Sequence, residues 1–163
     1  MNMIIEEYIK NHLEYDNGEL YWKDRIGRGK RFNDRKAGWY DNKGYKRVCV
    51  KGRDIPAHRI VFFIHHGYWP NYTDHINRIK HDNRIENLRE CTNAQNLWNA
   101  SSTNNKSKYG RGVSWHKEKK KYVARIRINC KTIHLGYFDD SDLAQLVASE
   151  ARDKYYGEFN YDY

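Results

Sequence analysis

The sequence predicts an α+β protein whose chain is organised in three parts. Residues 4–13 carry apolar side chains at helical spacing, which predicts a short helix there, and a second helix is expected over residues 57–65. Short β-prone stretches, separated by turns rich in glycine and asparagine, predict strands around these helices. Residues 121–128 alternate apolar and basic side chains, as a half-buried strand does. With 163 residues, the chain is long enough for one ordinary domain or two small ones.

The N-terminal part covers residues 1–55. After the first helix, Asn17-Gly18 marks a turn and residues 19–23 are expected to form a strand. Residues 44–51 and 54–57 are expected to pair as a hairpin through Gly52-Arg53. The stretch 23–36 is dense in Lys and Arg. It is either a solvated loop or an arm that follows DNA phosphates, with Lys30 and Arg31 as contacts.

The second part covers residues 56–100 and begins with the helix at 57–65. Residues 72–76 are β-prone, residues 77–87 are polar and charged, and residues 88–91 can form a short return strand. Thr92-Asn93-Ala94-Gln95 fits a capping box, so a helix is expected to begin at Thr92. The predicted order is therefore strand, loop, strand and helix.

Candidate catalytic residues fall on this second part. An acid and a histidine, Asp74-His75, end the first strand, and Asn87 and Asn96 follow at the loop and on the helix. A histidine suits a general base because its pKa lies near neutral. Carboxylate and amide oxygens are the ligands that Mg²⁺ prefers. The simpler interpretation is a hydrogen-bonded turn on an ordinary basic domain, and the combined pattern makes it the weaker one.

The spacing of these four residues resembles the HNH nuclease motif. The resemblance implies that His75 activates water, that Asp74 and Asn96 hold one Mg²⁺ or Mn²⁺, and that Asn87 orients the loop or His75. It also suggests that arginines steady the scissile phosphate, with Arg78, Arg84 and Arg89 as candidates. His58-Arg59 resembles HNH proteins of mobile elements. We expect packing or phosphate contacts for His58, His65 and His66, and a surface role for His81.

A small, polar linker at residues 101–108 precedes the third part, residues 109–163. Arg111-Gly112-Val113, the strand at 121–126, Leu135-Gly136-Tyr137-Phe138 and the C-terminal Tyr156-Gly157 resemble an AP2-type DNA-binding domain. Such a domain has a three-stranded sheet and one helix. Cys130 and Ser114 depart from the family pattern, at positions where glycine and arginine are frequent.

The alternation in this third part predicts one apolar and one basic face of the sheet. The expected apolar face carries Tyr122, Ala124, Ile126 and Ile128, and the opposite face carries Val123, Arg125 and Arg127. A helix capped by Ser141 and ended by Gly157 is expected to cover the apolar face with Leu143, Leu146, Val147, Ala151 and Tyr155. The expected DNA contacts of this part are Arg111, Trp115, Lys117, Arg125 and Arg127.

Composition limits the class of partner. A net charge of +9 and a high aromatic content favour double-stranded DNA, and no apolar run is long enough for a membrane span. The three cysteines are widely spaced without a C-x-x-C pair, so we expect a reduced cytoplasmic setting and no structural zinc. The pairing of an HNH-like motif with an AP2-like part resembles homing endonucleases of phages. This resemblance implies a site-specific, metal-dependent DNA endonuclease, which we expect to act as a monomer or weak dimer. The alternatives are a non-catalytic DNA-binding regulator and an RNA-binding module.

Overall fold

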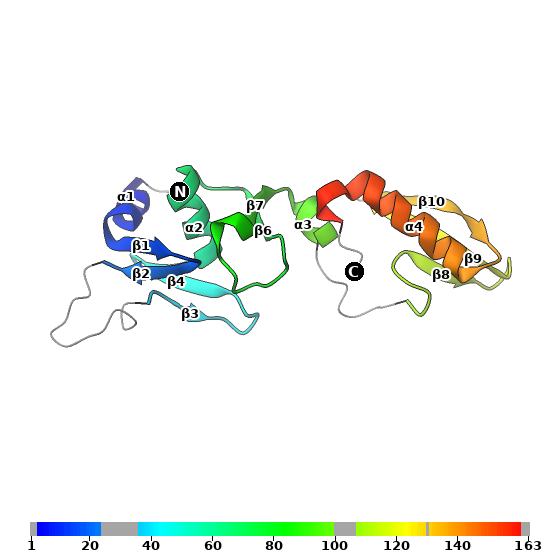
Figure 1. Cartoon of the computed structure of the whole chain (residues 1–163), viewed down its shortest axis with the longest axis horizontal. Coiled ribbons are helices and arrows are strands. Elements are labelled where there is room, and N and C mark those ends of the chain that lie inside the picture. Colours follow the sequence, from blue (N-terminus) through cyan, green and yellow to red (C-terminus); the bar gives the residue numbers. More distant parts are fainter. Residues whose placement is uncertain (1–2, 24–35, 100–106, 130, 161–163) are drawn as a thin grey trace. The chain divides into compact units, whose positions relative to one another are not determined.

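The computed structural model describes residues 3–23, 36–99, 107–129 and 131–160. These residues form an α+β fold, as predicted, and the chain divides into two compact units, Met1–Asn93 and Ala94–Tyr163 (Figure 1). Lys30, Arg31 and most of the basic stretch lie outside the described residues, as do Cys130 and residues 101–106 of the expected linker. Within the described part, no helix has the length and apolar character needed to cross a bilayer.

The first unit contains the elements that the N-terminal half predicts. Its helices and strands are α1 (Met3–His12), β1 (Leu13–Asp16), β2 (Glu19–Trp22), β3 (Trp39–Tyr40), β4 (Lys46–Val50), β5 (Arg53–Pro56), α2 (Ala57–His66), β6 (Tyr72–His75), the 3-10 turn η2 (Ile85–Asn87) and β7 (Leu88–Cys91). The strands pair as β1-β2, β3-β4-β5 and β6-β7, all antiparallel. The expected hairpin of β4 and β5 is confirmed, but its turn is Lys51-Gly52, one residue earlier than predicted, because Val50 pairs with Arg53.

A single apolar core holds the first unit together. Ile5 and Ile9 of α1 share this core with Val48 of β4, Phe63 of α2 and Leu88 of β7, all of them buried. The helix α2 ends at Gly67, whose left-handed backbone lets its N–H donate to the carbonyl of Phe63. The N-terminal elements thus share one apolar core with β7, the strand that pairs with β6, on which Asp74 and His75 lie.

The second unit is a three-stranded antiparallel sheet covered by one long helix. Its elements are α3 (Asn93–Asn99, whose first residue still belongs to the first unit), β8 (Val113–His116), β9 (Lys121–Ile128), β10 (Lys131–Phe138), α4 (Ser141–Tyr156) and the 3-10 turn η3 (Gly157–Phe159). The strand order is β10-β9-β8, so β9 is central. The predicted sheet-and-helix architecture is confirmed, and Gly157 ends α4 as expected.

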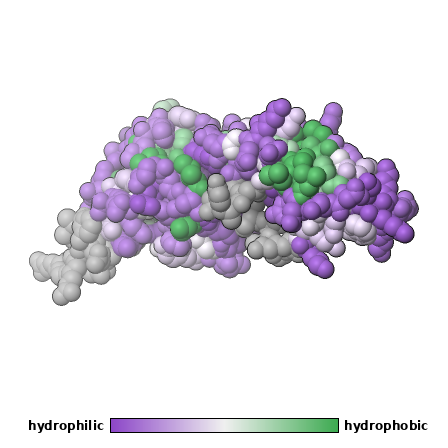
Figure 2. All heavy atoms as spheres, turned by 45° about the vertical axis from the view of Figure 1, so that its right-hand side comes forward, coloured by the Kyte–Doolittle hydropathy of each residue, from purple (hydrophilic) through white to green (hydrophobic). Residues whose placement is uncertain are grey.

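The face that α4 turns to the sheet differs from the predicted one. Leu143, Leu146 and Tyr155 are exposed by 48, 54 and 48%. The residues that α4 buries are one position further along each turn: Ala144, Ala148, Arg152 and Tyr156. Small alanines let the helix approach Val113 and Ala124 closely, and burial of Arg152 is offset because its Nη1 donates to the carbonyl of Arg111 at 2.6 Å. An apolar area is visible on the surface of the second unit (Figure 2).

The cap of α4 also differs from the prediction. Ser141 is the first helical residue, and Asp140 precedes it as the N-cap. The Asp140 carboxylate accepts from the backbone N–H groups of Asp142 and Leu143, at 2.6 and 3.2 Å. An ionised carboxylate at this position also interacts favourably with the positive end of the helix dipole, which a serine hydroxyl does less well.

Candidate active site

The acid and the histidine of the motif lie side by side at the end of β6. In the antiparallel pair, Asp74 lies opposite Arg89 and His75 lies opposite Leu88. Both side chains are buried, with 5 and 6% of their surfaces exposed. Because neighbouring residues of a strand point to opposite faces, both faces of β6 are covered at this point.

Arg89 neutralises the buried carboxylate of Asp74. Its Nε and Nη2 atoms lie 3.0 and 2.9 Å from Oδ2 of Asp74. A buried carboxylate is tolerated when a hydrogen-bonded cation accompanies it. Arg89, which we expected at a phosphate, therefore uses its guanidinium to hold Asp74, and any phosphate contact would have to share it.

His75 is held between an amide and a second imidazole. Its Nε2 lies 3.0 Å from Oδ1 of Asn83, and the ring of His58 packs edge-on at a centroid distance of 5.1 Å. Burial lowers the pKa of His75, against the opposing effects of the Asn83 hydrogen bond and the nearby carboxylate of Asp74. The imidazole is therefore neutral near pH 7, which is the form that can accept a proton.

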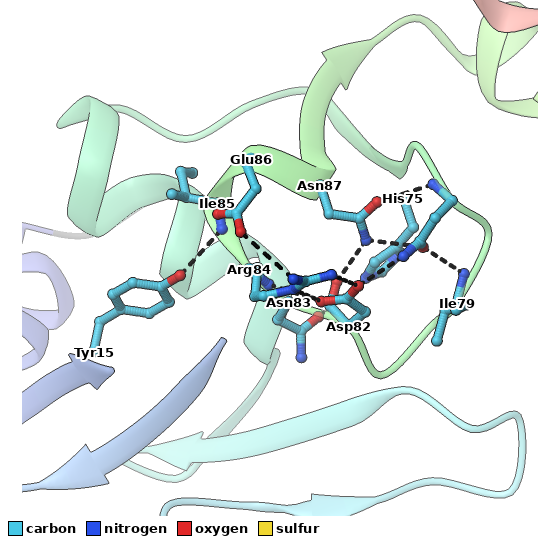
Figure 3. A network of polar contacts seen from close by, with 10 residues as sticks. Tyr15, His75, Ile79, Asp82, Asn83, Arg84, Ile85, Glu86 and Asn87 are labelled. Carbon is cyan, nitrogen blue, oxygen red and sulfur yellow. Dashed lines mark hydrogen bonds and ion pairs between the residues drawn. The ribbon is translucent and has the colours of Figure 1, made fainter. Parts of the chain in front are cut away.

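Asn87 organises the loop between β6 and β7 (Figure 3). Its Oδ1 accepts from the backbone N–H of Asn77 at 2.9 Å, and its Nδ2 donates to Oδ1 of Asn77 at 2.9 Å and to the carbonyl of Asp82 at 2.8 Å. Its own carbonyl accepts from Ile76 N at 2.9 Å. Of the two roles expected for Asn87, these contacts favour the one that orients the loop.

The two remaining candidate arginines, Arg78 and Arg84, lie in this loop between β6 and β7. Arg84 makes two 2.8 Å hydrogen bonds to the carboxylate of Asp82, and this pairing is the main reason why the pKa of Asp82 lies well below its usual range. Arg78 is half-buried and has a left-handed backbone with φ of 63°. Arg84 thus closes the loop, and a phosphate would have to compete with Asp82 for it.

Asn83 is the residue of this site that the sequence did not reveal. Its sequence context places it in the polar loop, yet only 1% of its surface is exposed and its amide contacts His75 directly. Nothing in its sequence context separates it from its exposed neighbours His81 and Arg84. Only the folded path of the loop turns this asparagine inward.

The four histidines near the motif other than His75 occupy different surroundings. His58 packs against the rings of Tyr45 and His75, which agrees with the expected packing role. His65 and His66 are exposed and lie against Tyr15 and Phe62. His81 is exposed on the motif loop, which agrees with its expected surface role.

Burial of His58 makes stability depend on pH. Burial, with a smaller effect of His75, lowers the pKa of His58 from 6.5 to about 3. The unfolded chain therefore binds a proton at this residue below pH 6.5 that the folded chain excludes, and stability falls as the pH decreases. We expect His58 to remove about 2 kcal/mol of the unfolding free energy between pH 7 and pH 5.

Urea unfolding of wild type and His58→Gln at the two pH values measures this effect. The substitution should flatten the pH dependence, while His81→Gln, at an exposed position of the loop, should keep it. Equal slopes for wild type and His58→Gln would contradict the prediction.

Asn96, the second expected metal ligand, is half-buried on α3, within the second unit. The helix itself is confirmed and begins at Asn93, with Thr92 in the position before it. The contact of Asn96 with a cation shared with Asp74 stays a prediction.

The basic face of the second unit carries the two predicted arginines on β9. Arg125 lies opposite His134 and Arg127 opposite Thr132, and both arginines are exposed. Val123, on the same face, is only 1% exposed, so this face is not exposed along its whole length. It pairs with Ser114 and Tyr137, and Tyr137 gathers His116, His134 and Lys119 around its ring.

The other expected DNA contacts of this unit lie elsewhere. Trp115 pairs with Tyr122 on the side of the sheet opposite Arg125, and the two rings are 4.9 Å apart. Arg111 donates to the carbonyl of Trp98 at 3.1 Å and lies over the ring of Tyr156. Lys117 is exposed at the turn after β8. Of the five residues, only Arg125 and Arg127 share one face by strand alternation.

A buried Asp–His pair on a strand, with one partner fixed by an arginine and the other by an amide, is suited to hydrolysis assisted by a general base and a cation. Residues 56–97 match the family model described as HNH endonuclease, and this part of the chain is therefore an HNH endonuclease domain. Comparisons with curated proteins and with solved structures gave no match.

Proposed function

We propose that this protein is a metal-dependent endonuclease that hydrolyses phosphodiester bonds in duplex DNA at a preferred site. The observation that supports it most is His75, a buried imidazole with a lowered pKa next to Asp74 inside the HNH endonuclease domain. The direct test is conversion of supercoiled plasmid to nicked or linear DNA, with Mg²⁺ and with EDTA. Cleavage only with the metal supports the proposal, and intact plasmid carrying a bound protein would contradict it.

His75 acts as the base in the proposed reaction. The neutral imidazole takes a proton from a water molecule while the water oxygen forms a bond to phosphorus. The bond between phosphorus and the 3′-oxygen breaks, and the leaving oxygen then takes a proton from solvent. The hydrogen bond from His75 Nε2 to Asn83 Oδ1 stabilises the imidazolium that forms.

Asp74 and Asn96 would hold one Mg²⁺ or Mn²⁺. The described residues contain no group of three or more His, Cys, Asp or Glu side chains around one point, so a cage made only of such side chains is not available there. A carboxylate and an amide oxygen, completed by water and phosphate oxygens, suit a hard cation that keeps part of its hydration shell. The bound cation supplies positive charge for the phosphate and for the leaving oxygen. Arg89 keeps the Asp74 carboxylate oriented.

Sequence preference is assigned to the second unit, which we propose to be an AP2-type reader. An antiparallel sheet can enter the major groove, and arginine is the usual reader of guanine there. The support is the exposed pair Arg125 and Arg127 on one face of β9, opposite the face that α4 covers. Arg111, Trp115 and Lys117 would contact DNA from neighbouring positions.

Substitutions should separate base readers from phosphate contacts. We expect Arg125→Ala and Arg127→Ala each to cost about 1–3 kcal/mol of binding to the preferred site and to relax specificity at one position. Lys117→Ala should weaken all duplexes alike and lower the salt slope by about one. Binding titrations on specific and random duplexes at several salt concentrations measure both effects. An equal loss on both duplexes for Arg125→Ala and Arg127→Ala would remove these residues from the reader.

The combination of an HNH domain and an AP2-like reader resembles homing endonucleases of phages. We therefore assign the protein to the cytoplasm of an infected bacterium, where it would act as a monomer or weak dimer. The separate arginine-bearing sheet also suits a non-catalytic DNA-binding regulator. Specific binding without cleavage in Mg²⁺ would favour that second function.

A further inference from the structure

A tyrosine from the N-terminal part of the first unit lies against the buried histidines of the site. Tyr45 directly precedes β4, and its ring centroid is 6.2 Å from that of His75 and 5.8 Å from that of His58. The match to the HNH endonuclease model begins at residue 56, so Tyr45 is not part of it. The turn between β3 and β4 therefore brings a side chain from outside the family motif to the motif histidine.

Contacts from two sides fix the place of Tyr45. Oδ1 of Asp41 accepts from the backbone N–H groups of Lys43 and Tyr45, at 2.9 Å each, and the backbone N–H of Asp41 donates to the carbonyl of Tyr45 at 2.8 Å. From the motif loop, Nζ of Lys80 lies 5.0 Å from the ring centroid of Tyr45 and donates to the carbonyl of Lys43 at 3.0 Å. The ring is thus held by its own turn and by the loop that follows β6.

The hydroxyl group of Tyr45 makes no hydrogen bond within the described part of the chain, and its oxygen is open to solvent. Partial burial raises the pKa of Tyr45, and the carboxylates of Asp41 and Asp74 raise it further. The phenol therefore keeps its proton near pH 7 and is available as a donor, close enough to Asp74 for that carboxylate to act on it.

We infer that the hydroxyl of Tyr45 donates a hydrogen bond to an oxygen of the scissile phosphate, with the ammonium group of Lys80 beside it. This inference rests on the proposed function, which brings the phosphate to His75 and Asp74. Because the ring of Tyr45 packs against His75, a phosphate in that place lies next to the hydroxyl.

The chemistry of the two donors suits a phosphate. Phosphate oxygens only accept hydrogen bonds, and a neutral phenol offers one donor that is not lost near pH 7. The exposed Lys80 uses one of its three N–H groups on Lys43 and keeps two for phosphate oxygens. Neither group reads a base, so the contact is independent of DNA sequence.

Tyr45→Phe removes the hydroxyl and keeps the ring. In the full-length chain with Mg²⁺, we expect the single-turnover rate of cleavage to fall by about 10- to 100-fold, as for loss of a hydrogen bond to a charged group. The thermal unfolding midpoint should stay close to that of wild type, because the hydroxyl makes no hydrogen bond to a described residue. Lys80→Gln should lower the salt slope of DNA binding by about one.

Tyr40→Phe is the matched control. Tyr40 lies on β3 of the same hairpin and is 54% exposed, and Nζ of Lys46 lies 5.8 Å from its ring centroid. Among the described histidines, none packs against this ring. Loss of its hydroxyl should leave the cleavage rate unchanged.

A second readout needs neither metal nor cleavage. Nuclear magnetic resonance of protein labelled at the tyrosine Cζ atoms follows the carbon that carries each hydroxyl, and Tyr45→Phe and Tyr40→Phe assign the two signals. A duplex with the sequence that the protein binds, added in EDTA, should shift the Tyr45 signal and leave the Tyr40 signal in place.

Two results would overturn the inference. One is a wild-type rate of cleavage in Tyr45→Phe, and the other is a Tyr45 signal that does not move at saturating duplex. Failure of the proposed function is distinct from both, because wild type would then bind DNA without cleaving it in Mg²⁺. The Tyr45 signal would in that case still report whether the hydroxyl contacts the duplex.

Discussion

Replacing His75 with alanine is expected to lower the single-turnover rate of DNA cleavage by about 10²–10⁴-fold. The reason is that the buried, neutral imidazole beside Asp74 is the group assigned to take the proton from water. DNA affinity should stay within about tenfold of wild type, because the base contributes to chemistry more than to docking. Rates at saturating protein and equilibrium titrations measure the two quantities separately.

The matched control is His81→Ala. His81 is a histidine of the same loop, but its side chain is exposed. Its loss should leave the cleavage rate close to that of wild type. Near-native cleavage by His75→Ala would remove this residue from the role of base, whatever the result for His81.

Removal of the divalent cation is expected to have an effect of similar size. EDTA should abolish cleavage by the wild-type protein, because removal of the cation removes the positive charge that stabilises the transition state at the phosphate. Excess Mg²⁺ or Mn²⁺ should restore cleavage. Asp74→Ala and Asn96→Ala should each abolish metal-dependent cleavage. Asn96→Asp should keep part of the activity, since a carboxylate oxygen still coordinates a hard cation.

Asp74 needs a control for its structural role, because its carboxylate also pairs with Arg89. Asp74→Asn keeps the shape of the side chain, and its thermal unfolding shows how much stability the ion pair contributes. Asp139→Asn removes an exposed carboxylate that pairs with Lys121 in the second unit and should leave cleavage unchanged. Full wild-type activity in EDTA would contradict the metal-assisted mechanism.

The elements around the site could be predicted because their signals are local. The β-prone stretch that ends in Asp74-His75 became β6, and residues 88–91 became β7. The capping sequence at Thr92 predicts α3, and Asn17-Gly18 predicts the tight turn between β1 and β2. Each of these signals depends on a few neighbouring residues and needs no distant partner.

The parts that could not be predicted depend on contacts between distant residues. Asn83 turns inward only because the β1-β2 hairpin and Asp82 shape the loop on either side of it. The packed face of α4 follows Ala144 and Ala148, since small side chains allow a close approach to the sheet, whereas a count of apolar residues favours Leu143 and Leu146. Hydrophobicity alone does not say how near two backbones will lie.

The shared core of the first unit limits how the proposed nuclease could be transferred between proteins. The family match begins at residue 56, yet Phe63 and Leu88 pack with Ile5 and Ile9, and Tyr15 and Gly18 brace the loop that carries Asn83. A fragment that starts at residue 56 would contain the residues assigned to the reaction. It would lack the N-terminal residues that pack against Phe63 and Leu88 and that contact the loop of Asn83. To join this unit to another DNA-binding domain, by recombination or by engineering, the chain from α1 onward would have to be transferred as a whole.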